Sequence, residues 1–104
     1  MIPICCADDA DSALIAGICA GLEEEAVPFH VHRWVQTPGM DLASVVAGQM
    51  SALQVGIGVE SNGGLVLYHE KLGKKPYLTE KREYARRLGK NAARLVKGLP
   101  LYLD

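Results

Sequence analysis

The sequence predicts one α/β domain over residues 1–104, with three layers (α/β/α) and a small mixed, mostly parallel sheet of four to five strands. Short apolar runs of strand length alternate with longer stretches of helical apolar spacing, which is typical of parallel strands joined by helices. Ser61-Asn62-Gly63-Gly64 lies between two apolar runs and is a hairpin signal, so one strand should be antiparallel. The chain is long enough for one hydrophobic core and too short for two.

The first half of the chain predicts a strand, a helix and a strand. The apolar run from Ile2 to Cys6 reads as a buried strand. Asp8, Asp9, Asp11 and Ser12 follow it and are suited to capping the N-terminus of a helix over residues 11–25. Pro28 stops that helix, and the alternation of apolar and polar residues over 27–35 predicts a half-buried second strand.

The second half predicts a second helix, two paired strands and a last helix. Asp41 can cap a helix that continues to Met50. Residues 53–60 and 65–68 form the two arms of the hairpin, and residues 76–78 can add a short edge strand. The last helix should run over residues 79–97.

The last helix has one apolar and one basic face. The apolar face comprises Tyr84, Ala85, Leu88, Ala92, Leu95 and Val96, and the basic face comprises Arg82, Arg86, Lys90, Arg94 and Lys97. Gly98 and Pro100 then end the helix. A solvated basic face is the simpler interpretation, and a single Phe and a single Trp offer little stacking for nucleic-acid bases, so we expect no nucleic-acid partner.

Composition indicates an ordinary globular protein. Apolar residues make up 49% of the chain and charged residues 22%, and no apolar run reaches the roughly 18–20 residues that span a bilayer. The first residues lack the basic start of a signal peptide, so we expect a cytoplasmic protein without a membrane partner. Three cysteines without metal-binding spacing indicate reduced, buried thiols.

Charge is unevenly distributed along the chain. Residues 1–60 carry eight acids and one base, whereas residues 71–97 carry ten bases and two acids. Glu23, Glu24 and Glu25 lie where the first helix should end, and acids there oppose the helix dipole. Two interpretations stay open: a solvated helix end, or a carboxylate held out toward a metal or a basic patch on a partner.

Other chemistry is poorly supported. The turn after the first strand has three acids and no glycine, so it would repel a phosphate. A receiver domain needs an Asp at the end of the third strand to accept a phosphoryl group, and no Asp stands there. His30 and His32 face the same way on a strand but have no evident third ligand. No serine or cysteine has the setting of a nucleophile, so no catalytic residue is predicted.

Three segments together resemble one family. Residues 21–29 (GLEEEAVPF) are similar to the pattern G-I/L-E-E-E-G-I/V-P-F of the small subunit of diol and glycerol dehydratase reactivating factors. Residues 90–101 are similar to its C-terminal pattern N-N-A-A-R-L-V-K-G-I/L-P-F, and residues 55–59 to its V-G-I-A/G strand. The resemblance extends over about residues 2–101. Ala26, Lys90 and Leu101 depart from it, standing where the family has glycine, asparagine and phenylalanine.

The resemblance implies a non-catalytic subunit of a chaperone-like factor. Such a subunit is similar to the medium subunit of a cobalamin-dependent dehydratase and pairs with a large ATPase subunit of actin-like fold that binds ATP or ADP. It would leave that partner and dock on the dehydratase catalytic subunit, so that damaged cobalamin is released. The alternative is a short medium subunit of the dehydratase itself, although the N-terminal extension typical of that subunit is not seen here.

The resemblance also implies site residues. It assigns a divalent metal, Mg²⁺, to Glu24 at the interface with the large subunit. We expect partner contacts from Glu23, Glu24, Glu25, Arg94 and Lys97. In this interpretation a cation supplied from outside relieves the acidic helix end. A cytoplasmic location follows, and association with a bacterial microcompartment stays open.

Overall fold

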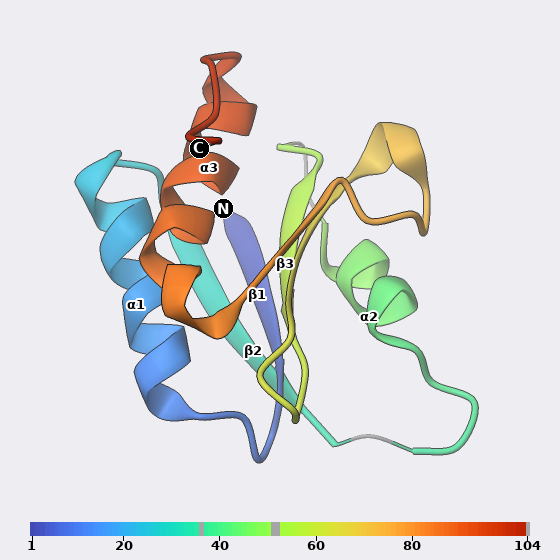
Figure 1. Cartoon of the computed structure of the whole chain (residues 1–104). Helices are drawn as coiled ribbons and strands as arrows, with labels where there is room; N and C mark the ends of the chain where they lie inside the picture. The colour runs from blue at the N-terminus through green and yellow to red at the C-terminus, as the bar shows by residue number, and fades with distance from the viewer. Residues whose placement is uncertain (36, 51–52, 104) are drawn as a thin grey trace.

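A computed structural model describes residues 1–35, 37–50 and 53–103, and Figure 1 shows their arrangement. The strands are β1 (Ile2–Ala7), β2 (Phe29–Trp34), β3 (Val55–Val59), β4 (Leu65–His69) and β5 (Leu78–Glu80). They form one sheet in the order β2-β1-β3-β4-β5. β1 pairs in parallel with β2 and β3, whereas β4 pairs antiparallel with β3 and β5. Within the described residues β4 is thus the one strand that runs against the others, which confirms the predicted mixed sheet.

The helices cover both faces of this sheet. α1 (Ser12–Glu24) and α3 (Ala85–Lys97) pack against each other on one face, and α2 (Leu42–Gln49) lies on the other (Figure 1). The larger core lies under α1 and α3, and a smaller one lies under α2. Cys6 belongs to the first core and Cys5 to the second, because neighbouring strand residues point to opposite faces. The predicted three-layer α/β/α fold is confirmed.

The turn and cap residues act as their types predict. Asp11 accepts a hydrogen bond from the Ala13 amide at 2.9 Å and caps α1, and Asp41 accepts one from the Ser44 amide at 2.7 Å and caps α2. In the hairpin the Glu60 amide donates to the Gly64 carbonyl at 2.9 Å. These bonds set the ends of the elements close to the predicted positions.

The start of the last helix differs from the prediction. Leu78, Thr79 and Glu80 pair with β4, and residues 82–84 form a single 3-10 turn before α3 begins at Ala85. Pairing with the edge of β4 gives these residues backbone partners, whereas the first N–H groups of a helix have none within the helix. Tyr84, predicted on the apolar face of the helix, is therefore 39% exposed.

Glycines let α1 and α3 approach closely. A Cβ atom on Gly21 would lie 2.1 Å from the Arg86 carbonyl oxygen, and one on Gly89 would lie 2.1 Å from the Ile18 carbonyl oxygen. Neither helix can carry a side chain at these points, so the two backbones are in direct contact. This contact brings the C-terminal end of α1 beside the basic residues of α3.

The cysteines and the helix lengths bear on two other predictions. The three thiols are free, and Cys5 and Cys6 are buried as predicted, whereas Cys19 is only partly buried. Burial raises the pKa of the Cys5 thiol to about 12 and also raises that of Cys6. Among the described residues no helix is both long and apolar enough to cross a membrane.

Candidate functional site: the acidic end of α1 against α3

The acidic run lies where α1 ends and the chain turns toward β2. The helix ends at Glu24, Glu25 is its C-cap, and Ala26 adopts φ +58°. The Ala26 amide donates to the Glu23 carbonyl at 3.1 Å and the Val27 amide to the Leu22 carbonyl at 3.2 Å. This is the left-handed helix end that glycine favours, which explains why a glycine suits the position of Ala26.

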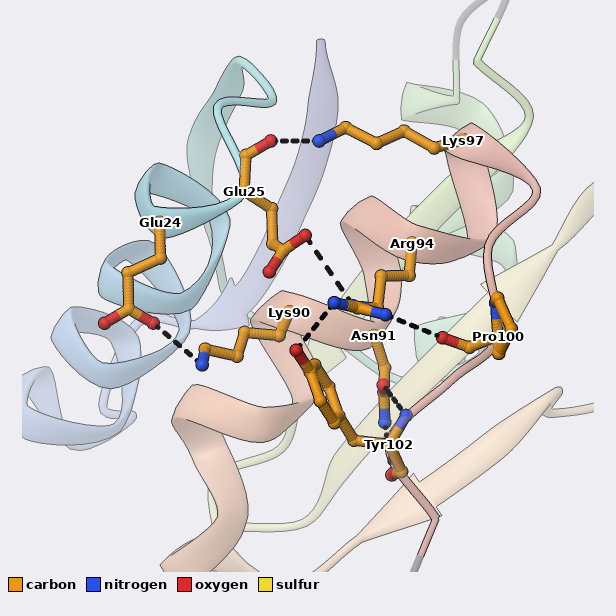
Figure 2. Close-up of polar contacts among 8 residues, drawn as sticks. All are labelled: Glu24, Glu25, Lys90, Asn91, Arg94, Lys97, Pro100 and Tyr102. Carbon is orange, nitrogen blue, oxygen red and sulfur yellow. Dashed lines mark hydrogen bonds and ion pairs between the residues drawn. The ribbon is translucent and has the colours of Figure 1, made fainter.

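Glu24 faces two bases of α3. Its carboxylate forms an ion pair with Arg86. Its Oε2 also lies 3.4 Å from Nζ of Lys90, and Figure 2 shows this second contact. The Glu24 side chain is 32% exposed, that of Lys90 31% and that of Arg86 64%. The pair is therefore open to solvent, and its carboxylate remains accessible to a partner.

Glu25 is held more tightly against α3. Its Oε1 lies 3.6 Å from Nε of Arg94, and its side chain is only 15% exposed. Lys97 donates from Nζ to the Glu25 main-chain carbonyl (Figure 2), so a cation lies at the helix end whose carbonyls are unsatisfied. The two neighbouring glutamates thus differ: Glu24 faces outward and Glu25 inward, while the Glu23 residue is exposed.

These contacts bear on one expectation. Four bases of the same chain, Arg86, Lys90, Arg94 and Lys97, already contact the acidic helix end, so this end is not simply solvated and a cation supplied from outside would compete with these bases. The basic face of α3 is likewise not simply solvated. Both results follow from the close packing of α1 on α3, which places residues about seventy positions apart side by side. Surface pairs of this kind contribute about 0–1 kcal/mol each, so they orient side chains more than they stabilise the fold.

A further set of contacts was not anticipated from the sequence. Asn91 is fully buried, and its side-chain amide bonds both the carbonyl (3.0 Å) and the amide (2.7 Å) of Tyr102. Arg94 donates to the Tyr102 hydroxyl at 2.6 Å and to the Pro100 carbonyl at 3.2 Å (Figure 2). The sequence offered one signal of these contacts: Asn91 is a polar residue among the apolar positions of the amphipathic last helix.

His30 and His32, the other candidate metal ligands from the sequence, lie on β2 without a third ligand among the described residues. No group of three or more His, Cys, Asp or Glu side chains is placed to hold a metal within residues 1–35, 37–50 and 53–103. At the carboxyl ends of β1 and β2 lies a hollow of about 420 Å³ whose lining includes Trp34, Asp41 and Glu60. Its carboxylates make it unsuitable for a phosphate.

Comparison with known proteins identifies the family. The model of the family described as dehydratase medium subunit matches residues 1–102. The chain belongs to this family. It is 38% identical over 87 residues to the propanediol dehydratase-reactivating factor small subunit of Citrobacter freundii, an alignment that covers 80% of this chain and 74% of that protein.

Solved structures agree with this relationship. A glycerol dehydratase reactivase is 32% identical, covers 98% of this chain and 96% of its own, and superposes with a TM-score of 0.82. A diol dehydratase-reactivating factor complexed with ADP and Mg²⁺ is also 32% identical, with the same coverage and a TM-score of 0.77. Within the dehydratase medium subunit family, the chain thus resembles the small subunit of reactivating factors, as residues 21–29 and 90–101 indicated.

In the structure, two of those family-like segments form the site. Residues 21–29 contain the acidic end of α1, and residues 90–101 contain Lys90, Arg94 and Lys97, which contact it. Four of the five residues predicted to bind a partner, Glu24, Glu25, Arg94 and Lys97, therefore lie at this site on the α1–α3 side of the sheet, and Glu23 is an exposed residue of α1 next to it. The comparisons do not test their roles, which stay predictions.

Proposed function

We propose that this chain is the small, non-catalytic subunit of a factor that reactivates a cobalamin-dependent diol or glycerol dehydratase. The observation that carries the proposal is the match to a glycerol dehydratase reactivase over 98% of this chain at a TM-score of 0.82. Its cellular setting in this proposal is the cytoplasm, and association with a microcompartment is a further point to test.

The proposed action is an exchange of partners. The chain belongs to the dehydratase medium subunit family, which supports the proposal that it takes the place of a medium subunit on a dehydratase. It would first pair with an ATPase large subunit, then leave it and dock on the dehydratase catalytic subunit, which releases damaged cobalamin. Partner exchange requires an interface that is specific but replaceable, and solvent-open ion pairs such as Glu24 with Arg86 and Lys90 suit that requirement.

Within this proposal Glu24 binds Mg²⁺ at the interface with the large subunit. Glu24 offers an outward carboxylate at this point, and the described residues hold no cluster of metal ligands, so the partner and water would supply the other ligands. Mg²⁺ commonly keeps several waters and takes one or two protein carboxylates, which fits a single glutamate. Binding would displace Lys90 and Arg86 from Glu24, so these bases would be free to contact acids on the partner.

The alternative function, a short medium subunit of the dehydratase itself, has less support. The curated relative and both solved relatives described above are reactivating factors or reactivases, not dehydratases. The two functions differ in one simple respect: a medium subunit would support diol turnover when combined with cobalamin and the other dehydratase subunits, whereas a reactivase subunit would not.

The first test is reactivation of an inactivated dehydratase. The chain, its large subunit and ATP are added to dehydratase that carries damaged cobalamin, and cobalamin release and restored turnover are measured. We expect restoration only with both subunits, and no ATP turnover by the chain alone. Failure to bind the large subunit, or diol turnover supported by the chain in place of a medium subunit, would overturn the proposal.

The second test concerns Glu24. Binding to the large subunit is measured by calorimetry with Mg-ADP and after removal of Mg²⁺ by EDTA, for wild type, Glu24→Gln and the matched control Glu23→Gln. We expect Glu24→Gln to weaken binding and to abolish its dependence on Mg²⁺, whereas Glu23→Gln keeps that dependence. Equal Mg²⁺ dependence in all three proteins would remove the metal role while leaving the reactivase function intact.

A further inference from the structure

The chain turns back on itself after α3. Gly98 adopts φ +73° and ends the helix, and the Leu99 amide donates to the Arg94 carbonyl at 2.9 Å. Pro100 prevents the helix from continuing, and residues 99–103 run back along α3 (Figure 2). We call residues 99–103 the C-terminal strap.

The strap is fastened to α3 by polar contacts and not by the core. The buried Asn91 amide bonds both backbone groups of Tyr102, and the guanidinium of Arg94 lies 4.1 Å from the centroid of the Tyr102 ring. The strap residues do not belong to either hydrophobic core, and Leu103 is 68% exposed. An open hollow of about 600 Å³ lies on the surface between the strap and α3. Removal of the strap would therefore take no residue from either hydrophobic core, but it would deprive the buried Asn91 amide of these two bonds.

Arg94 connects the strap to the acidic end of α1. One Nη donates to the Pro100 carbonyl and the other to the Tyr102 hydroxyl, so both outer nitrogens are engaged by the strap. Its Nε is then directed toward Glu25 Oε1, 3.6 Å away, which is an ion pair too long for a hydrogen bond. Without the strap, nothing in these contacts would keep the planar Arg94 fork in this orientation.

We propose that the C-terminal strap positions the partner-binding surface: through Asn91 and Arg94 it holds the Glu25 carboxylate inward, so that Glu23 and Glu24 alone face the partner. Asn91, Arg94 and Tyr102 are positioning residues that need not touch the partner, so for Glu25 and Arg94 this inference replaces the direct partner contact expected from the sequence. This inference rests on the proposed function for the identity of the partner, but the orientation of Glu25 can be measured in the isolated chain.

The test compares the chain ending at Leu99 with wild type, each with Glu25 and with Glu25→Gln. Ordering one long side chain at an interface corresponds to about 2- to 12-fold in Kd, so we expect removal of the strap to weaken binding to the large subunit within that range. In the Glu25→Gln background, removal of the strap should have no further effect. Leu103→Ser, an exposed strap residue beyond the Tyr102 contacts, should bind as wild type does.

Two outcomes would overturn the inference. Unchanged binding after strap removal would show that the strap does not position the surface, and equal weakening in both backgrounds would show direct contact of the strap with the partner. Should the shortened chain not fold, Arg94→Lys in the full chain replaces it in the same cycle, since lysine keeps the charge but lacks the rigid planar fork whose nitrogens point at Pro100, Tyr102 and Glu25.

The isolated chain gives an answer that does not need the partner. In wild type the NMR signal of the Arg94 Nε–H should be protected from exchange with water, and strap removal should abolish that protection. If strap removal abolishes the protection but wild type does not bind the large subunit, the strap contact is upheld and the proposed function is rejected. Unaltered protection would reject the strap inference whatever the partner is.

Discussion

Replacement of Gly21 by alanine tests the helix contact on which the candidate site depends. The added methyl group would lie 2.1 Å from the Arg86 carbonyl oxygen and 2.9 Å from the Lys90 amide nitrogen. Both atoms are backbone, so the clash cannot be relieved by a side-chain rotation. α1 and α3 must move apart, and with them the glutamates and bases that they carry.

The magnitude is a balance of two terms. Alanine in place of a mid-helix glycine stabilises by about 0.5–1 kcal/mol through helix propensity. Overpacking of a close contact costs about 1–3 kcal/mol and occasionally more, and a clash with backbone falls at the upper end. We therefore expect a net loss of about 2 kcal/mol, which is a substantial part of the roughly 5–15 kcal/mol stability of a domain.

Urea unfolding followed by circular dichroism measures this loss. With m of about 1–3 kcal/mol/M, Gly21→Ala should lower the midpoint by about 1 M. Gly48→Ala on α2 is the matched control, since a Cβ there meets nothing within 4 Å, and it should leave the midpoint unchanged or higher. Gly17→Ala, whose Cβ would lie 3.2 Å from the Ala85 methyl group, should fall between them. A Gly21→Ala protein as stable as Gly48→Ala would refute the close contact.

Three other predictions concern local structure. Ala26→Gly should raise the free energy of unfolding by about 0.5–1 kcal/mol. Relief of the left-handed alanine is worth about 1–2 kcal/mol, which exceeds the cost of about 0.4–1 kcal/mol from the entropy that glycine adds to the unfolded chain. A urea midpoint no higher than that of wild type would contradict this. Burial raises the pKa of the Cys5 thiol from 9.0 to about 12, so the thiol of the unfolded chain ionises at lower pH than that of the folded chain. The free energy of unfolding should therefore fall as pH rises from 9.0 toward 12, by at most about 1.4 kcal/mol per pH unit. In urea unfolding at each pH, Cys5→Ala should show a shallower fall over that range. Arg87 pairs with Glu80 through two hydrogen bonds of 2.7 and 3.1 Å that join α3 to β5. Because lysine cannot form this two-pronged pair, Arg87→Lys should lower Tm by several degrees in a thermal melt. Arg86→Lys, at a more exposed position, should leave Tm nearly unchanged.

Much of the fold could be predicted because its signals are local. Asp11 and Asp41 cap their helices, and Gly98 ends the last one, since each bond joins residues only a few positions apart. The hairpin turn before β4 follows from the same kind of local preference. The predicted start of the last helix was wrong because residues 78–80 pair with β4 instead. That pairing depends on residues more than ten positions away.

The candidate site could be predicted only in part. The resemblance to a known family pointed to Glu24, Arg94 and Lys97, and the structure brings them to one place. That Glu24 already pairs with bases of α3, and that Glu25 turns inward, could not be predicted, because glutamates adjacent in sequence are alike until their neighbours in space are known. Asn91 was missed for the same reason.

The sequence by itself determined the α/β/α class, the ends of most elements, the reduced cysteines and the family, since these depend on local propensity, periodicity and motif. Only the tertiary structure decided how the charges are arranged. Gly21 and Gly89 let two helices meet backbone to backbone, so Glu24 and Glu25 lie against the bases of α3. Electrostatic energy depends on distance in space and not along the chain, and that distance exists only once the helices are packed.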